Sequence, residues 1–193
     1  MIHIAIEGID GVGKTTVSEL LSKEINYKYV HKPLSEIFGE NKISEYIGLR
    51  NKINTMENRN ITAWFYCLGS IYMYEKYKKE NIITDRHLAS NYAWGDVEYN
   101  DDIFDLVLKK IGKPKLTVIL YASEEILKKR ILMRNKNDKD LKKIEYSNNH
   151  YKRLEKFCIN KKINYIFINT DKLTPKNIVD IIKKSMGDLN EKS

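Results

Sequence analysis

The residues best suited to chemistry lie close to the start of the chain. The sequence matches the pattern G-x-x-x-x-G-K-[ST] at consecutive positions, which are Gly8, Ile9, Asp10, Gly11, Val12, Gly13, Lys14 and Thr15. An apolar run precedes the pattern and a helical pattern follows it, and in that context the glycines let successive backbone N–H groups surround a polyphosphate. We expect Lys14 to reach the β- and γ-phosphates and the Thr15 hydroxyl to bind Mg²⁺. The loop therefore predicts binding of a nucleoside triphosphate.

The same loop occurs in kinases, GTPases and motor ATPases, so other residues must distinguish these classes. Asn135 to Asp138 match the guanine-reading pattern N-K-x-D, but they follow a charged helical segment instead of a strand end. Outside the phosphate loop itself, the chain also lacks a D-x-x-G switch motif. In a sequence rich in Asn and Lys, we interpret the N-K-x-D match as coincidence and favour a phosphotransferase over a GTPase.

A second candidate site follows the apolar run at Ile82 to Thr84. This run delivers Asp85 and Arg86 to its carboxyl end, where open α/β sheets bind ligands. A carboxylate there can orient Mg²⁺-bound water or accept a proton, and a guanidinium can hold a phosphate through two hydrogen bonds. Elsewhere such a dipeptide would be an ordinary surface ion pair. Its place at a strand end, in a chain with a phosphate loop, favours a role in catalysis.

These residues need a sheet to position them, and the hydrophobic pattern predicts one. The expected strands are Ile2 to Ile6, Tyr27 to Val30, Ile82 to Thr84, Leu116 to Tyr121 and Tyr165 to Ile168. The expected helices are Thr15 to Glu24, Ile61 to Lys79, Asp101 to Ile111, Glu124 to Met133, Tyr146 to Asn160 and Lys176 to Lys184. Short, β-branched strands that alternate with helices predict a doubly wound α/β fold of three layers around a five-stranded parallel sheet.

Length and composition limit the possible functions. The 193 residues fit one domain, which we place at residues 1–186, followed by a polar tail at 187–193. The net charge of +8 comes from lysines spread along the chain, so we expect no nucleic-acid polymer as partner. No uncharged stretch is long enough to cross a membrane, and no signal peptide is expected before the first strand. Two distant cysteines, Cys67 and Cys158, suit a cytoplasmic protein, and the four histidines lack the spacing of a zinc site.

Two motifs resemble the thymidylate kinase family, within the wider group of P-loop nucleoside and nucleoside-monophosphate kinases. The segment from Ile6 to Thr16 is close to that family's phosphate loop. Asp85-Arg86-His87, followed by Ser90, Ala93 and Gly95, is similar to its D-R-[YH]-x-x-S-x-x-A segment. The order of strands and helices agrees over nearly the whole chain. The resemblance implies transfer of the γ-phosphoryl group of ATP, bound with Mg²⁺, to an acceptor nucleotide.

The resemblance also implies residue roles. Arg86 would bind the acceptor phosphate or bridge it to the donor, Asp85 would support Mg²⁺ through water, and Arg134 would reach the phosphates when a lid at about 134–146 closes. Arg130 would flank adenine, together with the backbone of 169–171; the alternative for both arginines is a solvated helix face. The residues expected at the donor are Gly8, Asp10, Gly11, Val12, Gly13, Lys14, Thr15, Thr16 and Arg130. Those expected at the acceptor are Asp10, Lys32, Trp64, Phe65, Arg86 and Ser90.

The chain departs from the family where the base of the acceptor would be read. Lys32 precedes Pro33 where the family usually has an arginine. Trp64 or Phe65 could stack on a base, but Cys67 to Gly69 offer no arginine on that helix, and the expected glutamine before Gly95 is replaced by Trp94. Because polar readers determine which substrate a site accepts, thymidylate is one candidate acceptor among related nucleotides.

Two alternatives stay open. The chain could be a deoxynucleoside kinase, in which Asp85 or Glu7 would take the proton from a 5′-hydroxyl group. Asp-Arg at residues 85–86, where the nucleoside kinases of this group usually have Glu-Arg, favours a monophosphate acceptor. The chain could also be a non-catalytic nucleotide-binding regulator, although Lys14 and Arg86 argue against that. The family further implies a possible homodimer.

Overall fold

A parallel β-sheet forms the centre of the structure, a computed structural model that describes residues 1–39, 42–95, 101–135 and 138–191. Its strands are β1 (His3–Glu7), β2 (Lys28–His31), β3 (Ile82–Asp85), β4 (Leu116–Tyr121) and β5 (Tyr165–Asn169). All pairs are parallel, in the order β2-β3-β1-β4-β5. Ile6 on β1 pairs with Asp85 on β3, so the two predicted motifs leave the sheet side by side. The predicted sheet is confirmed.

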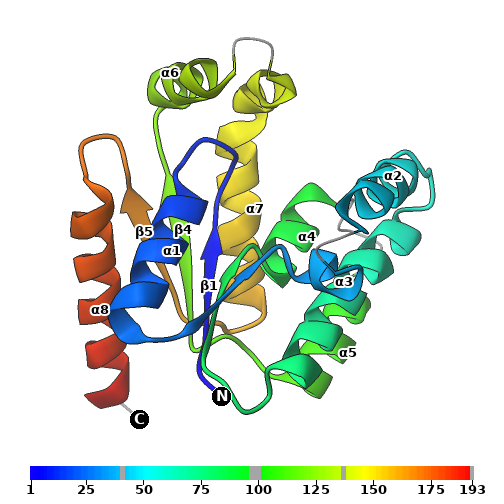
Figure 1. Cartoon of the computed structure of the whole chain (residues 1–193), viewed down its shortest axis with the longest axis horizontal. Coiled ribbons are helices and arrows are strands. Elements are labelled where there is room, and N and C mark those ends of the chain that lie inside the picture. Colours follow the sequence, from blue (N-terminus) through cyan, green and yellow to red (C-terminus); the bar gives the residue numbers. More distant parts are fainter. Residues whose placement is uncertain (40–41, 96–100, 136–137, 192–193) are drawn as a thin grey trace.

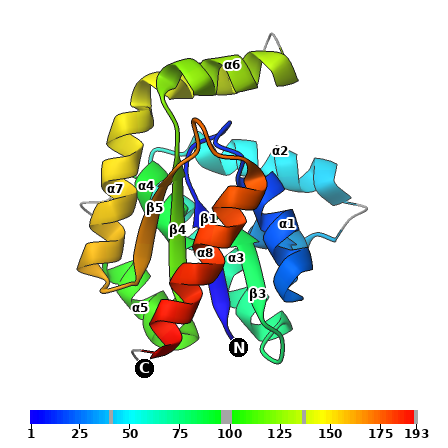
Figure 2. The same cartoon turned by 90° about the vertical axis from the view of Figure 1, so that its left-hand side faces the viewer.

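Helices cover both faces of the sheet (Figures 1 and 2). On one face, α1 (Lys14–Ile25) packs against α8 (Pro175–Glu191). On the other lie α3 (Arg59–Lys76), α4 (Leu88–Trp94), α5 (Asp101–Ile111) and α7 (Ser147–Asn160). The apolar core between these layers includes β-branched residues of the central strands and the rings of Phe104 and Phe157. The predicted doubly wound, three-layer fold is therefore confirmed.

The remaining elements lie beyond the carboxyl ends of the strands. Figure 2 shows α6 (Glu124–Arg134) running across the top of the molecule, and η4 (Lys139–Tyr146), a 3₁₀ helix, packs against it. Figure 1 shows α2 (Ile43–Asn54) on the opposite flank, and the short 3₁₀ helix η1 (Pro33–Ile37) packs on α3. These two groups of helices face each other across the end of the sheet where Asp85 emerges.

Several segments differ from the sequence-based expectation. The helices α2, α4, η1 and η4 were not expected. The helix α2 buries only Tyr46, and most of the short α4 is buried, so neither has an amphipathic pattern. The sequence analysis placed a polar tail at 187–193, but the helix α8 continues to Glu191. Cys67 and Cys158 are free and fully buried. No helix within the described ranges is both long and apolar enough to span a membrane.

Candidate active site

The loop after β1 is shaped by glycines in backbone conformations that other residues seldom adopt. Gly8 has a φ of 135°, and a Cβ atom there would lie 2.3 Å from the carbonyl oxygen of Leu120 on β4. Gly13 has a φ of 94° and precedes α1 without a side-chain cap on the helix. The first N–H groups of α1 are therefore available to an anion, and the helix dipole adds to its attraction.

Lys14 is buried within this loop. Its ammonium donates a hydrogen bond of 2.9 Å to the carbonyl oxygen of Ile9 and lies 4.0 Å from the Asp10 carboxylate. Only 6% of its side chain is exposed. Burial, with the charge of Arg86 nearby, lowers the pKa of Lys14 to about 8. A buried cation with so few partners is well placed to bind phosphate.

Asp85 has a carboxylate with one engaged oxygen and one free oxygen. The Thr15 hydroxyl donates a 2.6 Å hydrogen bond to Oδ2, and the imidazole Nδ1 of His31 lies 3.6 Å from the same atom. The other oxygen, Oδ1, is buried and has no hydrogen-bond partner among the described residues. Burial raises the pKa of this carboxyl, but His31, Lys14 and Thr15 outweigh that effect and lower it to about 2. An ionised carboxylate with a free buried oxygen beside a threonine hydroxyl fits a hydrated Mg²⁺ ion.

Arg86 is held in a backbone conformation that side chains seldom adopt. Its φ is 75°, which costs free energy in any residue other than glycine. The guanidinium donates a 2.7 Å bond to the Asp10 carboxylate and bonds of 3.2 Å to the carbonyl oxygen of Gly8 and the hydroxyl of Ser90. Burial opposes ionisation of Asp10, but Arg86, Lys14 and Lys143 hold its pKa well below the usual range. The strained backbone therefore brings Arg86 onto the phosphate loop.

Glu7, at the end of β1, fixes the start of α4. It is fully buried and accepts hydrogen bonds from the backbone N–H groups of His87 (2.9 Å) and Ser90 (3.3 Å), and from the Ser90 hydroxyl. Burial raises the pKa of Glu7 to about 7, although these hydrogen bonds and Arg86 act in the other direction. Glu7 thus ties β1 to the segment that carries Arg86.

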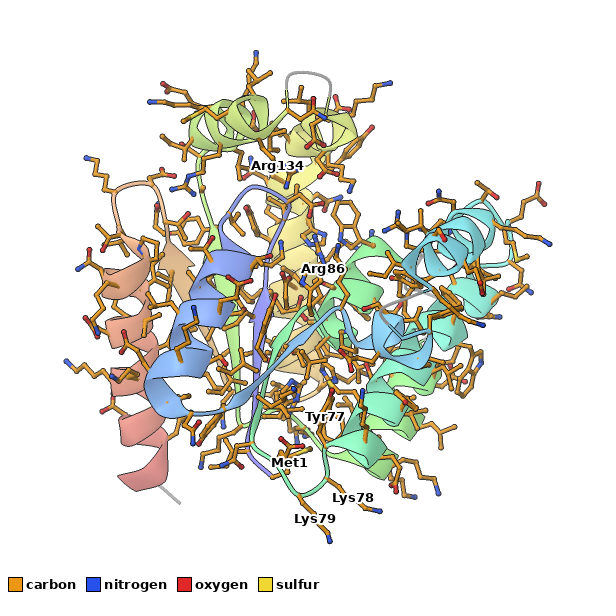
Figure 3. The ribbon with its side chains drawn as sticks, viewed as in Figure 1. Met1, Tyr77, Lys78, Lys79, Arg86 and Arg134 are labelled. Carbon is orange, nitrogen blue, oxygen red and sulfur yellow. The ribbon has the colours of Figure 1, made fainter. Side chains whose placement is uncertain are left out.

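Three cationic side chains come from α6 and η4, the helices above the sheet. Arg134 pairs with Asp138 at 2.6 Å and Asp140 at 2.8 Å, and Figure 3 shows it between α6 and the phosphate loop, above Arg86. Lys143 on η4 reaches Asp10 at 2.9 Å and Asp140 at 2.7 Å. The third cation is Arg130 on α6, for which the family resemblance implies a place beside adenine. It is held against the loop after β5. There, Arg130 donates to the hydroxyl and the carbonyl oxygen of Thr170 at 2.9 and 2.7 Å.

Lys143 was missed by the sequence analysis. It stands in a segment rich in lysine and aspartate, where no pattern separates it from its neighbours Lys139 and Lys142. Only the fold shows that η4 brings it within hydrogen-bonding distance of a residue 133 positions earlier. The guanine-reading match at 135–138 lies partly outside the described residues, and its Asp138 pairs with Arg134.

Two cavities meet above the sheet. The loop-side cavity, of about 410 Å³, is lined by the phosphate loop, Thr16, Asp85 and the lid residues Arg130 and Arg134. The helix-side cavity, of about 580 Å³, is lined by residues of α2, α3 and α4 together with Lys143. Among the described residues, three line both cavities, namely Asp10, Lys32 and Arg86. Each volume is within the range of small-ligand sites, so the geometry provides two ligand compartments joined at one charged contact.

The structure brings together most of the predicted site residues but not all. Gly11, Gly13, Lys14, Thr15 and Thr16 line the loop-side cavity, Ser90 lines the helix-side cavity, and Val12 is buried in the core. The expected stacking role of Trp64 and Phe65 is not supported, because neither lines either of these two cavities and Trp64 is 44% exposed. Their neighbour Tyr66, one position further round α3, lines the helix-side cavity instead.

Together, the sheet order, the phosphate loop and the two joined cavities define an ATP-dependent phosphotransferase of the P-loop class. The sequence matches the thymidylate kinase family over residues 6–182, so the chain belongs to that family and is a nucleoside-monophosphate kinase. A "Probable thymidylate kinase" of Methanocaldococcus jannaschii is 27% identical over 96% of this chain and 94% of its own length. The "Thymidylate kinase" of Nautilia profundicola is also 27% identical, over 89% of this chain and 90% of its own.

Solved structures share the fold. A deoxyadenosine kinase from M. mycoides with bound dATP has a TM-score of 0.65 at 22% identity, and the match covers 96% of this chain and 100% of that one. A thymidylate kinase from Candida albicans has a TM-score of 0.70 at 18% identity, covering 97% of this chain and 91% of that one. At these identities the likeness establishes the architecture, while the acceptor must be argued from the site.

Proposed function

We propose that this enzyme transfers the γ-phosphoryl group of ATP, bound with Mg²⁺, to the phosphate of dTMP. The observation that carries the proposal is the junction of the two cavities at Asp10, Lys32 and Arg86. A donor triphosphate on the loop and an acceptor monophosphate in the helix-side cavity would meet there. Both phosphates would then lie within reach of the half-buried Arg86 guanidinium, which is the contact that an in-line transfer requires.

Each charged group has a defined task in this proposal. The loop amides and Lys14 hold the donor phosphates, while Arg86 exchanges its bond to Asp10 for oxygens of the acceptor phosphate. Arg134 and Lys143 exchange their carboxylate partners for phosphate oxygens as the lid closes, which excludes water from the junction. Thr15 and Asp85 would hold the Mg²⁺ ion, which supplies charge neutralisation between the β- and γ-phosphates.

Two observations favour a monophosphate over a nucleoside as acceptor. A nucleoside hydroxyl must lose its proton to a base. Glu7 is fully buried and engaged by three hydrogen bonds, and Asp85 is bound by Thr15 with a pKa of about 2. Neither carboxylate is therefore free and basic enough for that task. An acceptor phosphate, already ionised at neutral pH, needs no such base.

The test is a panel of nucleosides and nucleoside monophosphates incubated with labelled ATP and Mg²⁺. Transfer to dTMP, with loss of transfer in Lys14→Met, supports the proposal. Transfer to nucleosides alone would establish the deoxynucleoside kinase alternative. Binding of ATP without transfer to any acceptor would establish the non-catalytic regulator.

We also propose that the enzyme is a homodimer, as the family implies. The support is a stripe of exposed apolar side chains on the outer side of α3, at Ile61, Trp64, Leu68 and Ile71. These positions are three or four residues apart and lie on the side opposite the helix-side cavity. Sedimentation equilibrium should give twice the chain mass, and Leu68→Glu should give monomers; a monomer at all concentrations of the unaltered protein rejects the dimer.

We place the enzyme in the cytoplasm. The support is its two free and buried thiols, Cys67 and Cys158, which suit a reducing compartment. Cell fractionation should recover the protein with cytoplasmic markers, and recovery with secreted material would reject this location.

A further inference from the structure

The end of the helix-side cavity away from the phosphate loop is formed by one side of each of two helices. The lining residues are Tyr46, Arg50 and Asn54 on α2, and Arg59, Thr62, Tyr66 and Ser70 on α3. Within each set the positions are three or four residues apart, so each set lies along one side of its helix. Two guanidinium groups and two phenol rings therefore share the compartment that would hold the base of the acceptor.

Most N–H donors of these two arginines are available. Arg50 donates a bond of 3.2 Å to the Asn51 side chain and also contacts Tyr46, with its guanidinium carbon 5.9 Å from the ring centre, and Arg59 donates one bond of 3.3 Å to the backbone carbonyl of Asn54. A guanidinium carries five N–H donors. Neither arginine forms an ion pair within the part of the chain that the structure describes, whereas Arg86 and Lys143 are both held by carboxylates.

Around this cavity, the carbonyl and carboxylate oxygens named below are already engaged. The side-chain oxygen of Asn54 accepts a 3.0 Å bond from the Tyr66 hydroxyl, and its backbone oxygen accepts the bond from Arg59. The Thr62 hydroxyl donates to the carbonyl oxygen of Ile53 at 3.3 Å. The carboxylates that line the cavity, Asp10 and Asp140, are ion-paired at the phosphate end. A base placed here meets the open N–H groups of two guanidiniums, and the acceptors left beside them include the hydroxyl oxygens of Thr62 and Tyr66.

We propose that Arg59 and Arg50 read the acceptor's base by donating hydrogen bonds to the carbonyl oxygen at C4 of a pyrimidine or C6 of a purine. The enzyme would thus select nucleotides of thymine, uracil or guanine over those of adenine and cytosine. An amino group at the same edge of the base would point its hydrogens at guanidinium N–H groups and leave both unpaired. This inference rests on the proposed function, because it assigns the base specificity of the same acceptor site.

The packing of α3 explains why no arginine comes from the middle of this helix. The resemblance to the family predicts an arginine at residues 67–69, where the sequence has Cys67, Leu68 and Gly69. A Cβ atom on Gly69 would lie 2.5 Å from the Cα of Leu34, because η1 packs directly on α3 at this point. No side chain fits there without moving η1. The first turn of α3 and the facing side of α2 carry the guanidinium groups instead.

The test measures kcat/KM for dTMP, dUMP, dGMP, dCMP and dAMP at saturating MgATP. The unaltered enzyme should prefer the first three. Arg59→Gln and Arg50→Gln should each lower kcat/KM for those three about 10- to 100-fold, mainly through KM, because a well-placed guanidinium pair discriminates between bases by about that factor. The values for dCMP and dAMP should stay nearly constant. Lys52→Gln, an exposed change on α2, is the matched control and should alter none of them.

Two further results decide the inference. Arg59→Lys keeps the charge without the planar fork, so it should fold even if Arg59→Gln does not and should still lose preference for dTMP, dUMP and dGMP. Preference of the unaltered enzyme for dAMP or dCMP, or an equal fall for all five acceptors in the variants, would overturn the inference and leave a monophosphate kinase. Failure to phosphorylate any of the five would instead overturn the proposed function.

Discussion

The phosphate end and the base end of the active site are built in different ways. At the phosphate end, short segments that follow β1 and β3 place Lys14, Asp85 and Arg86 on neighbouring strand ends. At the base end, α2 and α3 each contribute one side of a helix. The first arrangement depends on local sequence and on one sheet pairing. The second depends on how two helices pack, so residue types alone do not reveal it.

The two ends also differ in the state of their charges. At the phosphate end, the cations form ion pairs with carboxylates: Asp10 pairs with Arg86 and Lys143, and Asp140 pairs with Arg134. These carboxylates take the positions of ligand oxygens, so the cations are already oriented for phosphate. At the base end, Arg50 and Arg59 have no carboxylate partner among the described residues. Under the proposed function, the preorganised cations would serve phosphoryl transfer, and the open donors would serve the choice of substrate.

The largest effect should come from removing the charge in the phosphate loop. Lys14→Met should lower kcat by about 10³-fold, the upper range for loss of one group that stabilises transition-state charge. Steady-state turnover of MgATP with dTMP measures the effect, and an unchanged melting temperature shows that the fold is intact. Turnover equal to that of the unaltered enzyme would break the comparison, because the phosphate end would then not be the site of transfer.

The second prediction concerns Glu7, which holds the phosphate end together. Its folded-state pKa of about 7 lies above the ordinary value of 4.5, so the folded protein retains a proton that the unfolded chain releases. Stability should therefore fall as pH rises from 4.5 to 7, by about 3 kcal/mol from this group. Glu7→Gln cannot titrate and should lack that part of the fall.

Chemical denaturation of the unaltered protein and Glu7→Gln, between pH 4.5 and 8, measures the contribution of Glu7. The difference between their unfolding free energies should change with pH up to 7 and then level off. Parallel curves would show that Glu7 is charged in the folded protein at all these pH values, and its role in tying β1 to α4 would need another basis.

Sequence patterns anticipated the phosphate end because its requirements are local. Gly8, Lys14 and Arg86 each stand in a motif whose spacing follows from the geometry of a strand end. The side chains at the base end could not be predicted, for a physical reason. Trp64 and Tyr66 lie on the same helix, and only the packing of η1 and α2 decides which of them faces the cavity. Lys143 was missed similarly, since its partner Asp10 comes from the opposite end of the chain.

The third prediction tests whether the lid belongs to the phosphate end. Lys143→Met should lower kcat by about 10- to 100-fold, less than the loop lysine, because it removes one charge from the edge of the junction. The KM for dTMP should rise as well, since Lys143 lines the helix-side cavity. Lys142→Met, the neighbouring position, is the matched control. Equal effects of the two changes would mean that the lid contributes only general positive charge.

The smallest effect should appear in the pH dependence of ATP binding. Lys14 has a pKa of about 8 in the free enzyme, so it is charged below that pH and increasingly neutral above it. Phosphate binds the charged form, and each further pH unit should weaken binding up to tenfold. Between pH 7 and 9 the Kd for MgATP should therefore rise about tenfold, as measured by calorimetry. Lys14→Arg stays charged over this range and should show no such rise. If both proteins lose affinity equally, another group is titrating, and the buried loop lysine does not control donor binding.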